Sequence, residues 1–165
     1  MRLRGYEETD AAGTLAVFTR AVRVTASRAY NPQQIDAWAN DDRDVAEWHR
    51  VRAAANTQVA EIDGRPIGFI DVSPEGYINM LFVDPDHLRE GVASTLLHWA
   101  DATAREAGAI RLSTHASIAA RPFFEEHGFV VDEKCTPVIR GIALTNYHMT
   151  LTLDEPAPHD AYQPA

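Results

Sequence analysis

The stretch FVDPDHLREGVASTLLHWADA, at positions 82–102, constrains the fold of this chain more than any other. A strand-like run ends at Asp-Pro, a short polar loop follows, and an amphipathic helix begins after Gly91. The first N–H groups of a helix lack intrahelical partners, so with the helix dipole they can hold an anion. Gly91 allows close approach, Ala93 keeps the next position small, and Ser94 adds a hydroxyl. Taken alone, a Gly-x-Ala loop is more typical of an ordinary helix start.

This loop matches neither of the common nucleotide-binding loops. The chain contains no G-x-x-x-x-G-K-[ST] sequence and no G-x-G-x-x-G sequence. Lysine is nearly absent, and Arg89 is the one loop arginine that could clamp a transferable phosphate. A site built mainly from main-chain amides fits a pyrophosphate that is held and not transferred.

Composition narrows the class of protein. The 165 residues, 45% of them hydrophobic and 24% charged, fit one globular domain. A net charge of −9 disfavours a nucleic-acid partner, and it is open to two interpretations, simple solubility or attraction of a cationic substrate. The single Cys135 and the lack of an apolar leader or membrane-length stretch predict a cytoplasmic protein without disulfides or membrane contact. The histidines lack metal-ligand spacing, so we expect no metal site.

Hydrophobic periodicity and turn residues predict an α/β protein of the α+β type, in the order β-α-α-β-β-β-α-β-α-β-β. We expect strands at 3–6, 57–62, 66–72, 77–83, 110–115, 129–133 and 142–153. We expect helices from residue 9 or 10, from 32 with Asn31 as its cap, over 45–55, after 91 and around 123–124. Successive hairpins and one parallel crossover predict a mixed, twisted sheet with helices on both faces.

Local patterns add finer expectations. Trp48 and Val51 should face the core, and the last strand should carry a bulge near residues 145–146. Cys135 should lie in a loop. The Pro-containing tail at 154–165 should be disordered, and an exposed final strand could pair two copies in a homodimer.

Two segments together resemble a known family. INMLFVDPDHLREGVASTLLHWADATAREAG resembles motif A of the GNAT superfamily of acetyl-CoA-dependent N-acetyltransferases, and ASIAARPFFEEHGFVV resembles its motif B. The two lie in the expected order, with a strand between them. YNPQQIDAWA and RGIALTNYHM further resemble a bacterial subgroup of unassigned substrate. The resemblance covers about residues 1–153 and implies a single GNAT domain that uses acetyl-CoA.

The resemblance also implies which residues bind the cofactor. The main chain of Phe82 and Val83 would bond the pantetheine arm like an added strand, and the strands at 77–83 and 110–115 would splay apart to open the cleft. Ser117 would contact the cofactor, and Phe123 and Phe124 would line its thioester end. The pyrophosphate would be cradled by the amides of Leu88, Arg89, Glu90, Gly91, Val92, Ala93 and Ser94.

The chain departs from the family pattern in the cofactor loop. Leu88 replaces the usual Gln or Arg, and Glu90 would be unfavourable beside a pyrophosphate unless it points to solvent. Losing one side-chain donor costs about 1 kcal/mol if main-chain amides dominate. The loop therefore remains compatible with cofactor binding.

The catalytic groups depart further from the pattern. Phe124 occupies the slot where many members have a tyrosine as general acid, which leaves Ser117, His115 or water for that role. Asn79 stands where relatives often have a carboxylate, and it could still orient a water or the amine.

The general base and the oxyanion donor are therefore expected among groups other than Asn79 and Phe124. Asp71, Tyr77 and His115 remain as candidate bases, each open to a purely structural interpretation. The Phe82 amide is the expected oxyanion donor.

The leading hypothesis is an N-acetyltransferase that transfers acetyl from acetyl-CoA to a primary amine of a small molecule or peptide by direct attack. The alternative is a catalytically weak or inactive acyl-CoA-binding regulatory module, which Phe124 and Asn79 motivate. A more distant alternative is a binder of some other small molecule.

Overall fold

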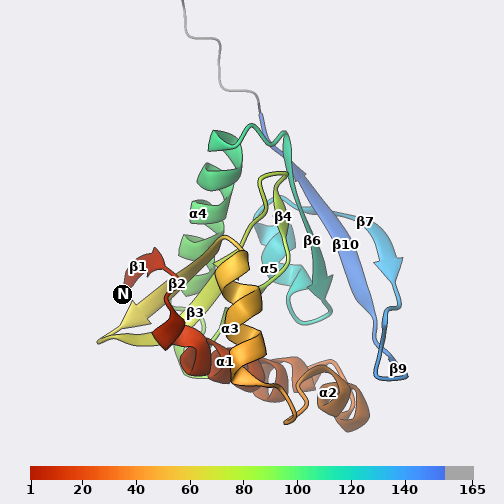
Figure 1. Ribbon diagram of the computed structural model, residues 1–165. Coiled ribbons are helices and arrows are strands. Elements are labelled where there is room, and N and C mark those ends of the chain that lie inside the picture. The colour runs from red at the N-terminus through yellow and green to blue at the C-terminus, as the bar shows by residue number, and fades with distance from the viewer. Residues whose placement is uncertain (155–165) are drawn as a thin grey trace, which may run out of the picture.

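The computed structural model describes residues 1–154, and the predicted disordered tail lies outside that range apart from Asp154. Figure 1 shows two sheets that diverge from one another, with helices packed on both sides. One sheet has the order β1-β2-β3-β5, formed by Arg2–Gly5, Thr57–Ile62, Arg65–Asp71 and Leu81–Val83. The other has the order β4-β6-β10-β7, formed by Tyr77–Ile78, Arg111–Ser117, Asn146–Thr152 and Val130–Cys135. The predicted α+β class is confirmed, the expected mixed sheet is divided in two, and three α-helices lie between β1 and β2 where the predicted order has two.

Helices enclose the sheets from both faces. The helices are α1 (Ala11–Arg20), α2 (Pro32–Trp38), α3 (Val45–Ala54), α4 (Val92–Glu106) and α5 (Arg121–Glu126). Helix α1 continues as a short π-helical segment, Ala21–Thr25. Successive residues of β3 point to opposite faces, so Phe69 belongs to the core under α1 while Ile70 belongs to the core under α4. The central strand thus supports both halves of the molecule.

The helix starts follow the sequence signals. The Gln34 amide donates to Asn31 Oδ1 over 2.9 Å, and the Asn31 amide donates to Gln34 Oε1 over 2.9 Å, which completes the predicted capping box before α2. Trp48 is buried in α3 as expected, but Val51 is 40% exposed. The prediction for Val51 was wrong because α3 buries Trp48 and Arg52, one turn apart, and Val51 lies off that line.

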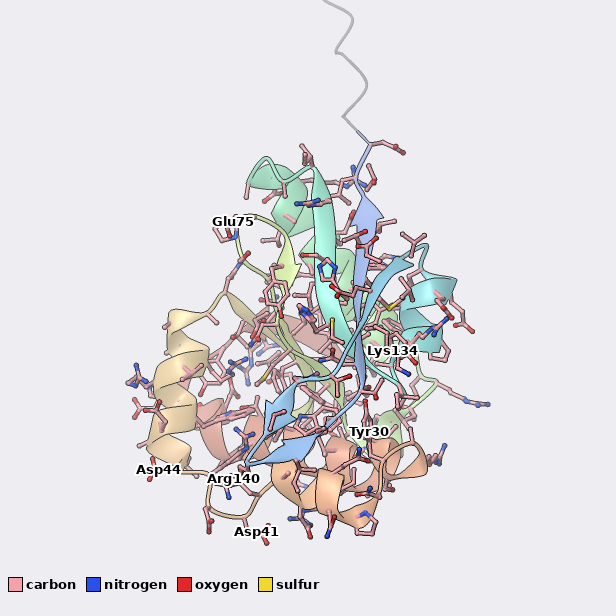
Figure 2. The ribbon with its side chains drawn as sticks, turned by 90° about the vertical axis from the view of Figure 1, so that its right-hand side faces the viewer. Tyr30, Asp41, Asp44, Glu75, Lys134 and Arg140 are labelled. Atoms are coloured by element: carbon pink, nitrogen blue, oxygen red, sulfur yellow. The ribbon has the colours of Figure 1, made fainter. Side chains whose placement is uncertain are left out.

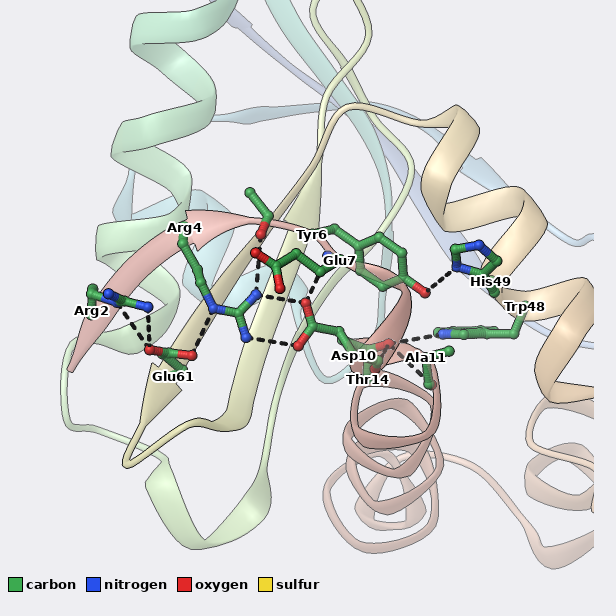
Figure 3. A network of polar contacts seen from close by, with 11 residues as sticks. Arg2, Arg4, Tyr6, Glu7, Asp10, Ala11, Thr14, Trp48, His49 and Glu61 are labelled. Atoms are coloured by element: carbon green, nitrogen blue, oxygen red, sulfur yellow. Dashed lines mark hydrogen bonds and ion pairs between the residues drawn. The ribbon is translucent and has the colours of Figure 1, made fainter.

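An ion-pair network fixes β1 to the start of α1 (Figure 3). The Arg4 guanidinium donates to both carboxylate oxygens of Asp10, over 2.7 and 2.8 Å. Its Nε also donates to Glu61 Oε2 over 2.7 Å. Burial opposes ionisation of Asp10, but the bonds from Arg4 outweigh it and the pKa of this carboxyl is lowered. The network anchors the helix whose far end reaches the cleft described below.

The strand predicted at 77–83 is broken. Asp71 Oδ1 accepts hydrogen bonds from the amides of Asn79 and Met80, over 3.0 and 3.1 Å, and Arg52 pairs with the other carboxylate oxygen. Before the break, β4 runs parallel to β6, with Ile78 opposite Thr114. After the break, β5 pairs antiparallel with β3. The two sheets separate at this point, which agrees with the predicted splaying of the strands at 77–83 and 110–115.

The C-terminal half holds further differences from expectation. The strand predicted at 142–153 is two strands, β9 (Ile142–Ala143) and β10, because the chain breaks at residues 144–145 where a bulge was expected. A short strand that was not predicted, β8 (Val138–Ile139), pairs with β9. Cys135 ends β7 and does not lie in a loop. Strand β10 lies between β6 and β7, so the final strand has no free edge for a second copy.

Candidate functional site

A cleft of about 950 Å³ opens where β5 and β6 diverge. Of the residues predicted to bind the cofactor or react, all except Glu90 and Asp71 line it. At one end, the loop end, lie Leu88, Arg89, Gly91, Val92, Ala93, Ser94, Phe123, Phe124 and His127. At the other, the aromatic end, lie Phe18, Tyr30, Trp38, Arg43, Met80, Phe82, Ile139 and Leu144. Asn79, His115 and Ser117 also line the cleft.

The loop end presents main-chain N–H groups. Gly91 caps α4 in the left-handed conformation, with φ +79°, and Arg89 also has a positive φ of 63°. No side chain caps the helix start, so its first amides remain available. A Cβ built at Gly91 would meet no atom within 4 Å, which shows that open space lies against the backbone there. This geometry suits an anion that approaches the chain closely.

Glu90 is turned out of the cleft. Its carboxylate is half exposed and lies 2.9 Å from His87 Nδ1. Its predicted place in the cofactor site therefore does not extend to the side chain. The orientation removes the unfavourable negative charge that the sequence places next to the helix start.

Ser94 is held by a histidine that sequence reasoning did not single out. His127 Nδ1 lies 2.8 Å from the carbonyl oxygen of Phe123, so Nδ1 carries the proton and donates. The other ring nitrogen, Nε2, lies 3.1 Å from Ser94 Oγ and accepts from the hydroxyl. The i, i+4 spacing of Phe123 and His127 at the end of α5 was the available sequence signal.

The open edge of β5 presents different amides from those predicted. The Asp71 amide donates to the Met80 carbonyl over 3.1 Å, and the Asp84 amide donates to the Ile67 carbonyl over 2.8 Å. Paired residues of an antiparallel ladder alternate between bonded and non-bonded, so Phe82, midway between these bonds, directs its main-chain N–H toward β3. Two predicted roles of the Phe82 main chain, as oxyanion donor and as a partner of the pantetheine arm, are therefore corrected. The amides of Leu81 and Val83 face the open edge.

Two histidines and a tyrosine line the exposed face of the second sheet. His115 Nδ1 lies 3.2 Å from the Tyr77 hydroxyl oxygen, and the His115 ring lies 5.0 Å from that of His148. Burial, and then the nearby His148, lower the pKa of His115. The imidazole is therefore neutral near pH 7 and able to accept a proton.

Asp71 is excluded as a free base by its contacts. It is 3% exposed, it pairs with Arg52, and its other oxygen accepts the two amides at the strand break. A carboxylate engaged in this way supports the backbone and does not face the cleft. Among the candidate bases named from the sequence, His115 and Tyr77 line the cleft.

The general-acid slot is apolar. Phe124 is 3% exposed and packs against Phe123 and Phe129. The hydroxyls that line the same cleft include those of Ser117 and Tyr30. Ser117 Oγ accepts the Ala120 amide over 3.1 Å.

Tyr30 joins the early helices to the second sheet. Its hydroxyl donates to the Thr145 carbonyl over 2.5 Å and accepts the Ile118 amide over 2.9 Å. Burial raises the pKa of this hydroxyl. Figure 2 shows Tyr30 at the foot of the sheet, and its ring packs edge-on against Trp38. No local sequence signal pointed to Phe18 or Arg43 as cleft residues.

Residues 1–154 contain neither a metal-binding cluster nor a membrane-spanning helix. No group of three or more His, Cys, Asp or Glu side chains in this part of the chain could hold a metal ion. No helix within the same range is both long and apolar enough to span a bilayer.

Comparisons with known proteins agree on one family. A family model described as an acetyltransferase (GNAT) domain matches residues 26–151. The uncharacterized N-acetyltransferase YafP of Escherichia coli is 42% identical over 149 residues, which cover 90% of this chain and 94% of that protein. A crystal structure from Rhodopseudomonas palustris, described as a GCN5-related N-acetyltransferase, is 33% identical with a TM-score of 0.88, covering 92% of this chain and 95% of that one. The YncA structure of Salmonella typhimurium, a putative acetyltransferase with acetyl-CoA, is 23% identical with a TM-score of 0.71, and the match covers 98% of both chains.

Proposed function

The chain belongs to the GNAT acetyltransferase family, and from that premise we propose that it transfers acetyl from acetyl-CoA to a primary amine of a small molecule or peptide by direct attack. The observation that carries this proposal is one cleft that contains both the uncapped start of α4 and the open edge of β5. The first can hold a pyrophosphate and the second can extend along a pantetheine arm. We take residues 1–153 as the acetyltransferase domain.

The donor is held mainly by main chain in this proposal. Amides from Leu88 to Ser94 bind the pyrophosphate, and Ser94 adds its hydroxyl. Val83 bonds the pantetheine arm as an added strand would. Ser117, Phe123 and Phe124 border the thioester end. This arrangement tolerates Leu88 in the family signature because amides do not depend on side-chain identity.

The reaction needs a base, an oxyanion donor and a leaving thiolate. The amine nitrogen attacks the thioester carbonyl, the C–S bond breaks, and coenzyme A leaves as thiolate. The Leu81 amide donates to the developing oxyanion, since it faces the open edge where the Phe82 amide does not. His115 accepts the amine proton, and Asn79 orients the amine or a water.

The leaving group needs no tyrosine at position 124. A thiol has a pKa near 8.5, so the thiolate is a fair leaving group near neutral pH. It takes its proton from solvent, either directly or relayed through the Ser117 hydroxyl, which lines the same cleft and regains a proton from water. Phe124 then serves as an apolar wall at the thioester end.

A thiol-release assay with acetyl-CoA and a panel of primary amines tests this function. Turnover of at least one amine is expected. Coenzyme A should also raise the melting temperature, because ligand at about 100 times its Kd stabilises by roughly 2.7 kcal/mol. Stabilisation without acetylation of any amine would favour the regulatory acyl-CoA-binding module, and no stabilisation would contradict both.

We also propose that the protein is cytoplasmic, as expected from its single cysteine, Cys135. A homodimer built by strand pairing would use β7, the edge of the second sheet, where Val130 is 59% exposed. Size-exclusion chromatography with light scattering would measure the oligomeric state.

A further inference from the structure

Arg43 carries the unpaired charge at the aromatic end of the cleft. Within residues 1–154, no carboxylate oxygen lies within 4.0 Å of its guanidinium, although most arginines of the chain are paired. The acids next to it in sequence are engaged elsewhere: Asp41 with Arg23, Asp42 with Arg140, and Asp44 with the start of α3. Figure 2 shows Arg140 beside the segment that carries Asp41 and Asp44. Arg43 is thus turned away from three neighbouring aspartates and toward the cleft.

The guanidinium of Arg43 is poorly compensated by protein groups. One Nη donates to the Trp38 carbonyl over 3.0 Å, and the cation lies 4.7 Å from the centre of the Phe18 ring. Its Nε is buried and has no hydrogen-bond partner among the described residues. Burial, and then the positive charges of Arg140 and Arg52, lower the pKa of Arg43. An arginine still keeps its charge near neutral pH, so the site favours an anion.

Other polar atoms without partners lie along the same cleft. Thr25 Oγ1 and Asn146 Oδ1 are buried without a hydrogen-bond partner in the described part of the chain, and both residues line the cleft with Arg43. Buried polar atoms are rarely left unpaired in folded proteins. Their concentration around one cleft indicates a polar ligand.

The walls around Arg43 are apolar. Phe82 packs against Phe18 with ring centres 5.0 Å apart and against Trp38 at 6.3 Å, and Met80 and Ile139 complete this part of the cleft. A ligand here would therefore place an apolar or aromatic body against these rings and an anionic group near the cation.

Resting on the acetyltransferase function proposed above, we propose that the acceptor is an amine that also carries a carboxylate, held by Arg43, and an apolar or aromatic body. An aromatic amino acid has this chemistry. A carboxylate matches the planar donors of arginine better than a neutral group can. Attraction of a cationic substrate was one interpretation of the net charge of −9. In this proposal the positive charge of Arg43, close to the ligand, decides instead.

The test compares matched acceptors that differ by one carboxylate: L-tryptophan with tryptamine, and L-phenylalanine with 2-phenylethylamine. We expect kcat/KM to be about 10- to 100-fold higher for the amino acids, the range expected for a charge-assisted bond. Arg43→Gln should remove that advantage and change the amines less than about threefold. Arg65→Gln is the matched control, because Arg65 is exposed, does not line the cleft and is not among the charges that act on Arg43.

Arg43→Lys keeps a cation at the site if the neutral variant folds poorly. It should retain part of the preference, since an ammonium group lacks the planar pair of donors. Equal kcat/KM for both members of each pair, or a loss of both in Arg43→Gln, would overturn the proposal.

If no acceptor is acetylated, calorimetric binding in the presence of coenzyme A separates the two proposals. Binding of the amino acids that depends on Arg43 would keep the carboxylate site and reject the catalytic function. No binding of the amino acids, or equal binding of the amines, would reject the carboxylate site.

Discussion

The two ends of the cleft are built by different means. The loop end presents main-chain amides from one loop and one helix start, a contiguous stretch of sequence, with residues of α5 packed beside them. The aromatic end is assembled from side chains of α1, α2, the segment before α3 and the β8–β9 hairpin. Main-chain amides can donate hydrogen bonds whatever their side chains are, whereas the contacts at the aromatic end depend on the identity of each residue. In the function proposed above, donor binding therefore rests on the backbone and acceptor choice on the side chains.

The largest effect is expected at Asp71, which accepts the amides of Asn79 and Met80 at the strand break. Asp71→Asn would leave the buried Arg52 unpaired, which should lower the free energy of unfolding by about 3–5 kcal/mol. An Asn oxygen could still accept the two amides, so the loss would report the ion pair. Urea unfolding followed by tryptophan fluorescence measures it.

An exposed ion pair supplies the control for this variant. Glu47 pairs with Arg50 on the surface of α3, with both side chains mostly exposed. Glu47→Gln should leave the unfolding midpoint unchanged. If Asp71→Asn were as stable as the wild type, the buried ion pair would not contribute to the stability of the fold.

The same contrast explains what could be read from the sequence. Gly91, the helix after it and the strand before it are consecutive, so their pattern predicted the helix start at this position. Arg43 and Phe18 carry no local signal, because tertiary packing brings them to the cleft from separate segments. The strand break was also missed, since its cause is Asp71, which precedes it by a whole turn and a strand. Alternation along β5 moved the oxyanion donor by one residue, an error that only strand register could reveal.

A catalytic test concerns the side chains of the cleft, beginning with His115. His115→Gln should lower kcat by about 100-fold or more if His115 is the base. In the wild type, kcat/KM should fall as pH drops through a pKa below 6.5, because only the neutral imidazole accepts a proton. His148→Gln removes one cause of that lowering, so the acid limb should move to higher pH. An acid limb that survives in His115→Gln would assign it to another group.

Gly91→Ala tests the loop end of the cleft. Gly91 and Gly108 flank α4, both have positive φ, and a Cβ at either meets no atom within 4 Å. Each substitution should cost about 1–2 kcal/mol of stability through backbone strain alone. Only Gly91→Ala should also weaken coenzyme A binding, by about tenfold, because its backbone borders the cleft. Equal affinity of the two variants in calorimetry would show that the loop end does not contact the pyrophosphate.

The smallest effect is expected at Ser94, the one hydroxyl that the helix start adds to its amides. Ser94→Ala should weaken coenzyme A binding by about fivefold, the size of one net hydrogen bond of about 1 kcal/mol. Because His127 positions this hydroxyl through Nε2, His127→Ala should cost a similar factor, and the double variant should lose no more than either single one. Additive losses would mean that the two side chains act separately. A loss far above fivefold at Ser94 would mean that side chains, and not amides, carry the loop end.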